Sequence, residues 1–219
     1  MTPRSETQTA REEIANSVLH GLGAALAVAS LATLVTLAAI RGDARHVVGC
    51  AVFGGALVAM FTSSTLYHAI THRRAKGVLR VIDHSAIYLA IAGTYTPFLL
   101  VTLRGAWGWS LLAVVWAAAA AGIALAATAG RRLGVLRVAI YIAMGWVGVV
   151  AFRPLLATLG PGGLSLVFGG GIIYTLGVAA YAWRGLRYHH AIWHAFVLGG
   201  SALHVLAVLW YVIPRASGF

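Results

Sequence analysis

Histidines at helical spacing are the residues of this sequence best suited to chemistry. His190 and His194 are four positions apart, so on a helix both side chains project from one face, one turn apart. Ser64 and His68 have the same spacing on another apolar stretch. Two imidazoles from one helix and a third from another can hold a metal ion with a fourth position open, as in catalytic zinc sites. The alternative for a lone pair of this kind is two interfacial histidines without a metal.

The five acidic residues narrow the candidates for acid–base chemistry to one. Four of them lie in tails, in loops or at the edge of an apolar stretch: Glu6, Glu12, Glu13 and Asp43. Asp83 alone lies inside an apolar stretch, where an ionisable side chain is costly and usually functional. A structural hydrogen-bond partner is the alternative role for Asp83. Ser64 is better suited to support the site residues through a contact than to act as a nucleophile.

The composition places these residues in a membrane protein. Of the 219 residues, 60% are hydrophobic and 10% are charged, and the mean hydropathy is +0.86. These values exclude a soluble globular protein and a disordered chain. The single cysteine, Cys50, excludes a disulfide scaffold and a cysteine-based zinc finger.

Seven apolar stretches are long enough to cross a bilayer, which needs about 20 residues as a helix. We therefore predict an all-α bundle of seven transmembrane helices over residues 13–214, with short tails at 1–12 and 215–219. Continuous apolar stretches favour helices over a barrel. Pro97 is expected to kink the third span or to mark a local break in it. The predicted spans are Asn16–Ile40, His46–Ile70, Leu79–Leu103, Trp109–Ala129, Leu133–Phe152, Leu164–Trp183 and Ala191–Pro214.

The net charge of +11 is explained by topology rather than by nucleic-acid binding, and no nucleic-acid partner is expected. With a cytosolic N-terminus and an outer C-terminus, eleven of the sixteen Lys and Arg residues fall on the inside, as the positive-inside rule requires. The same topology brings polar residues of four spans to the inner leaflet. They are Glu13, Asn16 and His20; Ser64 and His68; Asp83 and His84; and His190 and His194. This convergence favours a metal site of His68, His190, His194 and Asp83, with zinc as the default ion and iron, manganese or copper as alternatives.

Four motifs resemble the hemolysin III family, the bacterial branch of the progestin and adiponectin receptor (PAQR) membrane proteins. They are Glu13-Ile-Ala-Asn16-x3-His20, Ser64-Thr-Leu-Tyr67-His68, Asp83-His84-Ser85-Ala-Ile-Tyr88 running on to Gly93-Thr-Tyr-Thr-Pro97, and His190-Ala-Ile-Trp-His194. The resemblance implies seven helices, an inner N-terminus and one zinc ion held by His68, His190 and His194. It also implies that Asp83 and Ser64 lie beside the metal. Glu13, Asn16 and His20, on one helix face, are further candidates for partners of the metal ligands.

The resemblance implies a hydrolase linked to membrane homeostasis, because related receptors and alkaline ceramidases are linked to ceramide hydrolysis. Our first hypothesis is therefore a zinc-dependent hydrolase of a lipid amide or ester in the cell membrane, with a membrane lipid as its substrate or ligand. A non-enzymatic, zinc-stabilised sensor or regulator of the membrane is the main alternative. A pore-forming cytolysin and a proton-coupled transporter are weaker, since the outer halves of the spans are apolar and carry no chain of acids. The sequence itself specifies neither the substrate nor the oligomeric state.

Overall fold

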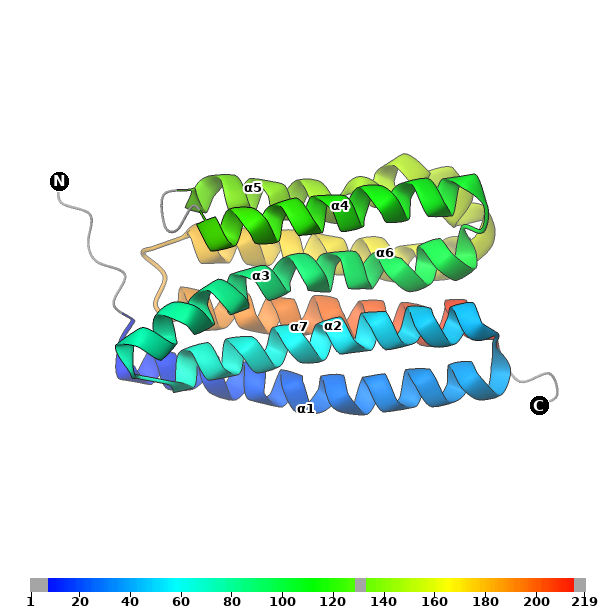
Figure 1. Cartoon of the computed structure of the whole chain (residues 1–219). Coiled ribbons are helices and arrows are strands. Elements are labelled where there is room, and N and C mark those ends of the chain that lie inside the picture. The colour runs from blue at the N-terminus through cyan, green and yellow to red at the C-terminus, as the bar shows by residue number, and fades with distance from the viewer. Residues whose placement is uncertain (1–7, 129–132, 215–219) are drawn as a thin grey trace.

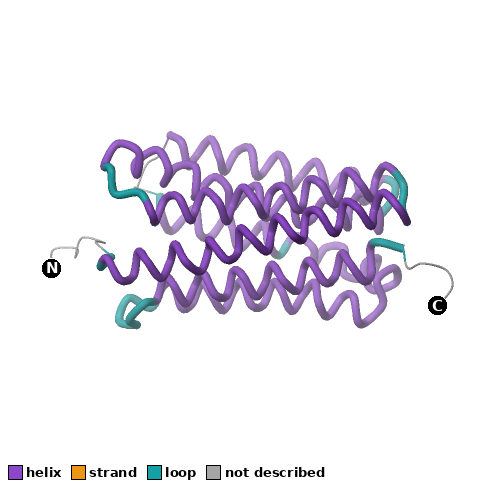
Figure 2. Tube along the Cα trace, turned by 90° about the horizontal axis from the view of Figure 1, so that it is seen from below, coloured by secondary structure: helices purple, strands orange, loops and turns teal. Residues whose placement is uncertain are grey.

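The computed structural model describes residues 8–128 and 133–214 and consists of helices that run along a common axis (Figures 1 and 2). Within these residues every regular element is a helix, as predicted. The tail segments 1–7 and 215–219 and the basic residues Arg131 and Arg132, which entered the charge count, lie outside the described residues. The element bounds are α1 (Ala10–Arg41), α2 (Ala44–Ala69), α3 (Arg73–Pro97), η1 (Phe98–Thr102), α4 (Ala106–Thr128), α5 (Gly134–Gly145), η2 (Val147–Ala151), α6 (Phe152–Ala182), α7 (His189–Ala207) and η3 (Val208–Val212).

Helix α1 begins inside the segment predicted as a polar tail. Thr9 and Glu12 form a capping box, in which the Thr9 backbone N–H donates to Glu12 Oε2 over 2.8 Å and the Glu12 N–H donates to Thr9 Oγ1 over 3.3 Å. This cap starts the helix at Ala10, so Glu13 and Asn16 lie within its first two turns. Figure 1 shows α1 and α2 side by side.

Six helical segments of the described chain are long and apolar enough to cross a membrane. One of them, Gly134–Ala182, has 49 residues and contains the two stretches predicted as the fifth and sixth spans. The predicted break between them, residues 153–163, is mostly helical, and the backbone leaves helical geometry at Gly160, with φ 66° and ψ 178°. Glycine takes this positive φ without steric cost, and Pro161 is suited to restart a helix. The structure therefore interrupts the helix within residues 153–163, but at Gly160 alone, and the predicted break is too long.

The α-helical part of α3 ends at Pro97, where a kink or a local break was predicted. The helix continues as the π-helical turn η1, because proline lacks the N–H that the α-helical ladder needs. Close packing holds this point against α2, where a Cβ on Gly49 would lie 2.9 Å from the Pro97 Cα.

Candidate metal centre

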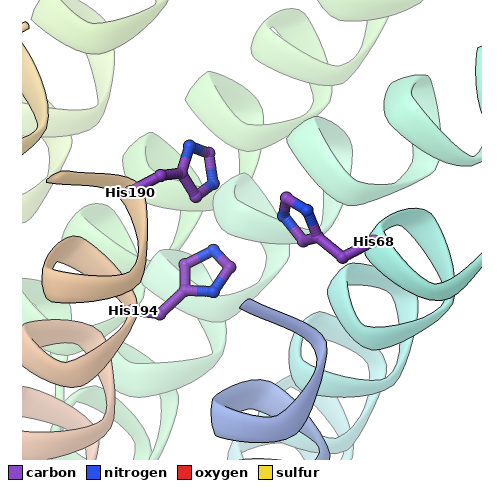
Figure 3. A group of neighbouring side chains, drawn as sticks. All are labelled: His68, His190 and His194. Carbon is purple, nitrogen blue, oxygen red and sulfur yellow. The ribbon is translucent and has the colours of Figure 1, made fainter. Parts of the chain in front are cut away.

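Three histidines meet at the end of the bundle where α1 begins. His190 and His194 project from the start of α7 and His68 from the end of α2 toward one space (Figure 3). One ring nitrogen of each lies within 4.8 Å of one ring nitrogen of each of the others. His68 and His194 are buried, and His190 is half-buried. The predicted convergence of these three side chains is confirmed, and they lie close enough to bind a metal ion.

The end of α2 is tied to α1 by a carboxylate. His68 Nδ1 lies 2.6 Å from Glu13 Oε2, and because the carboxylate oxygen accepts, this nitrogen carries the hydrogen and donates the hydrogen bond. The other nitrogen, Nε2, is buried and has no hydrogen-bond partner in the described structure. A neutral imidazole that donates from one nitrogen and offers an unpaired lone pair on the other is a metal ligand held by its outer partner. The donor set therefore fits a metal ion.

The second histidine of α7 is held in a similar manner. His194 Nδ1 donates to the backbone carbonyl of Asn16 over 3.3 Å, which leaves Nε2 to accept or to ligate. The ring of His20 stacks on the His194 ring, with centroids 3.5 Å apart and an angle of 16° between the planes. Both nitrogens of His20 are buried without a hydrogen-bond partner in the described structure, so this ring acts as a flat packing surface.

Asn16 completes the contacts between α1 and the histidines. It is fully buried, and its side-chain nitrogen lies 3.5 Å from His68 Nδ1 and 2.6 Å from the side-chain oxygen of Gln8. Three predicted residues of α1 therefore contact the clustered histidines: Glu13 and Asn16 lie against His68, and His20 lies against His194. Their predicted spacing on one helix face is what allows this.

Asp83 and Ser64 lie on the wall of the cavity next to the histidines. The Ser64 hydroxyl interacts with the Asp83 carboxylate, joining α2 to α3. Both side chains, together with His190 and His194, line one cavity of about 2010 Å³. The other predicted polar residue of this region, His84, turns to its own helix and donates from Nδ1 to the Arg80 carbonyl over 2.7 Å.

Lys76 is a part of this centre that our sequence analysis missed. Its ammonium group lies 2.8 Å from Glu13 Oε1, the carboxylate oxygen that His68 does not use. Glu13 is therefore held from both sides, and α3 joins α1 and α2 around it. The sequence did contain one feature that sets this residue apart: Lys76 is the only lysine among the sixteen Lys and Arg residues of the chain.

Comparison with known proteins agrees with this architecture. Residues 8–205 match the family model described as "Haemolysin-III related". The chain is 46% identical to the Hemolysin-3 homolog of Bacillus subtilis (strain 168), covering 94% of this chain and 96% of that protein. It is 46% identical to Hemolysin-3 of Bacillus cereus, with 96% of each chain covered. It is 27% identical to the human Monocyte to macrophage differentiation factor, over 96% of this chain and 89% of that protein.

No solved structure matches the chain. The family model covers most of the sequence, and the two bacterial relatives are similar over nearly their whole length. The chain is a multi-pass membrane protein that belongs to the haemolysin-III-related family.

Proposed function

We propose that this protein is a metal-dependent hydrolase of the cell membrane that cleaves an amide or ester bond of a lipid. The observation that carries the proposal is that one cavity is lined by His190, His194 and Asp83 at one end and by apolar side chains such as Leu111 and Leu155 deeper in the bundle. A reacting carbonyl can thus meet polar groups while its hydrocarbon chain stays out of water. Through this cleavage the protein would help to maintain the lipid composition of the membrane.

The metal we propose is one zinc ion per chain, held by His68, His190 and His194. Three imidazoles with an open fourth position are a ligand set that zinc commonly takes, although iron, manganese and copper also bind imidazole. The chemistry that such an ion supplies is Lewis acidity, which lowers the pKa of water and polarises a carbonyl.

Asp83 is the residue we assign to proton transfer. The sequence after His190 has alanine where the zinc proteases of the H-E-x-x-H type have their glutamate, so that general base is missing. Asp83 is the acid within an apolar stretch that lines the same cavity, and Ser64 orients its carboxylate. Asp83 would accept a proton from the attacking water and return it to the leaving group.

Seven membrane crossings with a cytosolic N-terminus form part of this proposal. A straight helix of 49 residues would be about 73 Å long, more than twice the roughly 30 Å of the hydrocarbon core. Two crossings by Gly134–Ala182, joined at Gly160, would agree with the positions of the start of α1 and the end of η3 at opposite ends of the bundle (Figure 1). The surplus of basic residues supports a cytosolic position for the metal centre.

Turnover of lipid amides and esters by purified, zinc-loaded protein tests the proposal. Asp83→Asn and His194→Ala should each reduce turnover by at least 100-fold. Asp43→Asn is the matched control for the lost carboxylate, and His72→Asn for the lost imidazole, since asparagine can still cap α3. Turnover that survives in Asp83→Asn and His194→Ala would contradict the assignment.

A non-enzymatic, metal-stabilised sensor or regulator is the second candidate. The observation that favours it is that the three histidines and Glu13 connect α1, α2 and α7, so that an ion would hold these helices together. This candidate predicts that His190→Ala lowers the Tm of the zinc-loaded protein and that no lipid is turned over. A pore is disfavoured, because the deep part of the cavity is lined mostly by apolar side chains.

A further inference from the structure

Basic side chains line the cavity at the metal-centre end of the bundle. Six of them line it, and they come from the start of α3, the start of α5 and the connection between α6 and α7. They are Arg73, Lys76, Arg80, Arg137, Arg184 and Arg187. Arginines from three separate parts of the chain thus line the same cavity.

Acidic side chains do not balance this charge. The cavity is lined by only three described acids, Glu12, Glu13 and Asp83. Glu13 is already held by His68 and Lys76, and Glu12 caps α1 through Thr9. Among the residues that the structure describes, neither Arg73 nor Arg80 forms an ion pair with an acid.

Away from these basic residues, the lining of the cavity is mostly apolar. Leu99, Leu111, Leu155 and Val197 line its deep part. A ligand that fits both parts has an anionic head and a hydrocarbon chain. The guanidinium group of arginine pairs with phosphate oxygens through two parallel hydrogen bonds, a geometry that lysine cannot reproduce.

We propose that this cavity binds an anionic lipid through its phosphate, with Arg73 and Arg80 as the main contacts, while Arg137 of α5 lines the same cavity. The proposal goes beyond the hydrolase function, because it needs neither the metal nor Asp83. The positive-inside rule explains why arginines lie at this end of the bundle. It does not explain why some of them line the cavity, and Arg11 and Arg74, at the same end, do not line it.

The contrast between adjacent arginines gives a matched experiment. Purified protein in a neutral detergent is titrated with phosphatidylglycerol and with phosphatidylcholine of the same acyl chains, and bound lipid is counted by native mass spectrometry. Wild-type protein should bind phosphatidylglycerol at least tenfold more tightly than phosphatidylcholine. The double variant Arg73→Gln/Arg80→Gln should lose about tenfold in phosphatidylglycerol affinity, while Arg11→Gln/Arg74→Gln should stay within twofold of wild type.

Two further arms make the outcome decisive. Arg73→Lys/Arg80→Lys retains the charge and should recover part of the lost affinity, which separates recognition from misfolding. Inorganic phosphate, added at the same concentration as phosphatidylglycerol, should not displace the bound lipid. Equal losses in the two glutamine variants, displacement by inorganic phosphate or equal binding of both lipids would each overturn the proposal.

The same titration separates this inference from the hydrolase function. Lipid binding without any turnover would overturn the proposed function alone. Turnover without a preference for phosphatidylglycerol would overturn this inference alone.

Discussion

The Glu13 carboxylate accepts a hydrogen bond from His68 Nδ1 over 2.6 Å, although 55 positions separate the two residues. The bond fixes the tautomer of His68 and points its free nitrogen, Nε2, at the space shared with His190 and His194. Outer partners of this kind usually change metal affinity by 10- to 100-fold. Glu13 is therefore as much a part of the proposed centre as the ligands.

Glu13→Gln should weaken zinc binding by about tenfold, because a neutral amide holds the Nδ1 proton less strongly than a carboxylate does. Competition with a fluorescent zinc chelator measures the affinity. Glu12→Gln is the matched control, since glutamine also completes a capping box and Glu12 does not contact the three histidines. An equal affinity for Glu13→Gln and wild type would remove Glu13 from the centre.

His20→Phe should leave the Tm unchanged or raise it slightly. Phenylalanine retains a flat ring against His194 and removes two buried nitrogens that have no hydrogen-bond partner in the described structure. His20→Ala should cost about 2 kcal/mol or more, since it opens a cavity between His194 and Phe61. Thermal unfolding of the metal-free protein checks both, and a phenylalanine variant as unstable as the alanine variant would show that the nitrogens of His20 are needed.

Gly170→Ala should destabilise the protein by about 1–3 kcal/mol through overpacking. A Cβ at this position would collide with the His204 ring, whose Nδ1 donates to the Gly200 carbonyl over 2.8 Å and so resists displacement. Gly171→Ala is the matched control, because no atom beyond its chain neighbours and its own helix backbone lies within 4 Å of its Cβ position, and alanine is the better helix former. Thermal unfolding of the two variants should therefore differ in sign relative to wild type, and equal Tm values would contradict the packing described here.

Asp43 should make stability depend on pH in the acid range. Hydrogen bonds from His46 and from the backbone at the start of α2 lower the pKa of Asp43 from 3.8 to about 2. Because the folded pKa lies below the unfolded one, this stabilisation is present above about pH 3.8 and is lost as the pH falls toward 2.

Asp43→Asn isolates that contribution, since asparagine still caps the helix but does not titrate. The Tm difference between wild type and Asp43→Asn should be a few degrees at pH 6 and should shrink toward pH 2.5. A difference that stays constant over this range would show that the ionised carboxylate contributes nothing.

Helix faces could be read from the sequence, and contacts between helices only in part. The spacing of His190 and His194, and of Glu13, Asn16 and His20, placed each set on one side of a helix, and the structure brings both sets to His68. The stacking of His20 on His194 could not be predicted, because it depends on the rotation of α1 about its own axis. This rotation is set by packing, such as the Phe61 ring against Gly23 and His20.

The connections between helices, and the pairing of charged residues near them, were also predicted only in part. The break predicted over residues 153–163 was the interval between two apolar stretches, yet one glycine at positive φ is enough to interrupt the helix there. Lys76 was counted as a topology charge, although its distance of 2.8 Å from Glu13 gives it a place beside His68. A charge count along the sequence does not distinguish a solvated cation from one that pairs within the bundle.

Metal analysis of the purified protein tests the central claim most directly. We expect one zinc ion per wild-type chain and less than one tenth of that in the His68→Ala/His190→Ala/His194→Ala variant, with the folded state of both checked by circular dichroism. Retention of one zinc ion per chain by a folded triple variant would contradict the metal centre and the mechanism built on it.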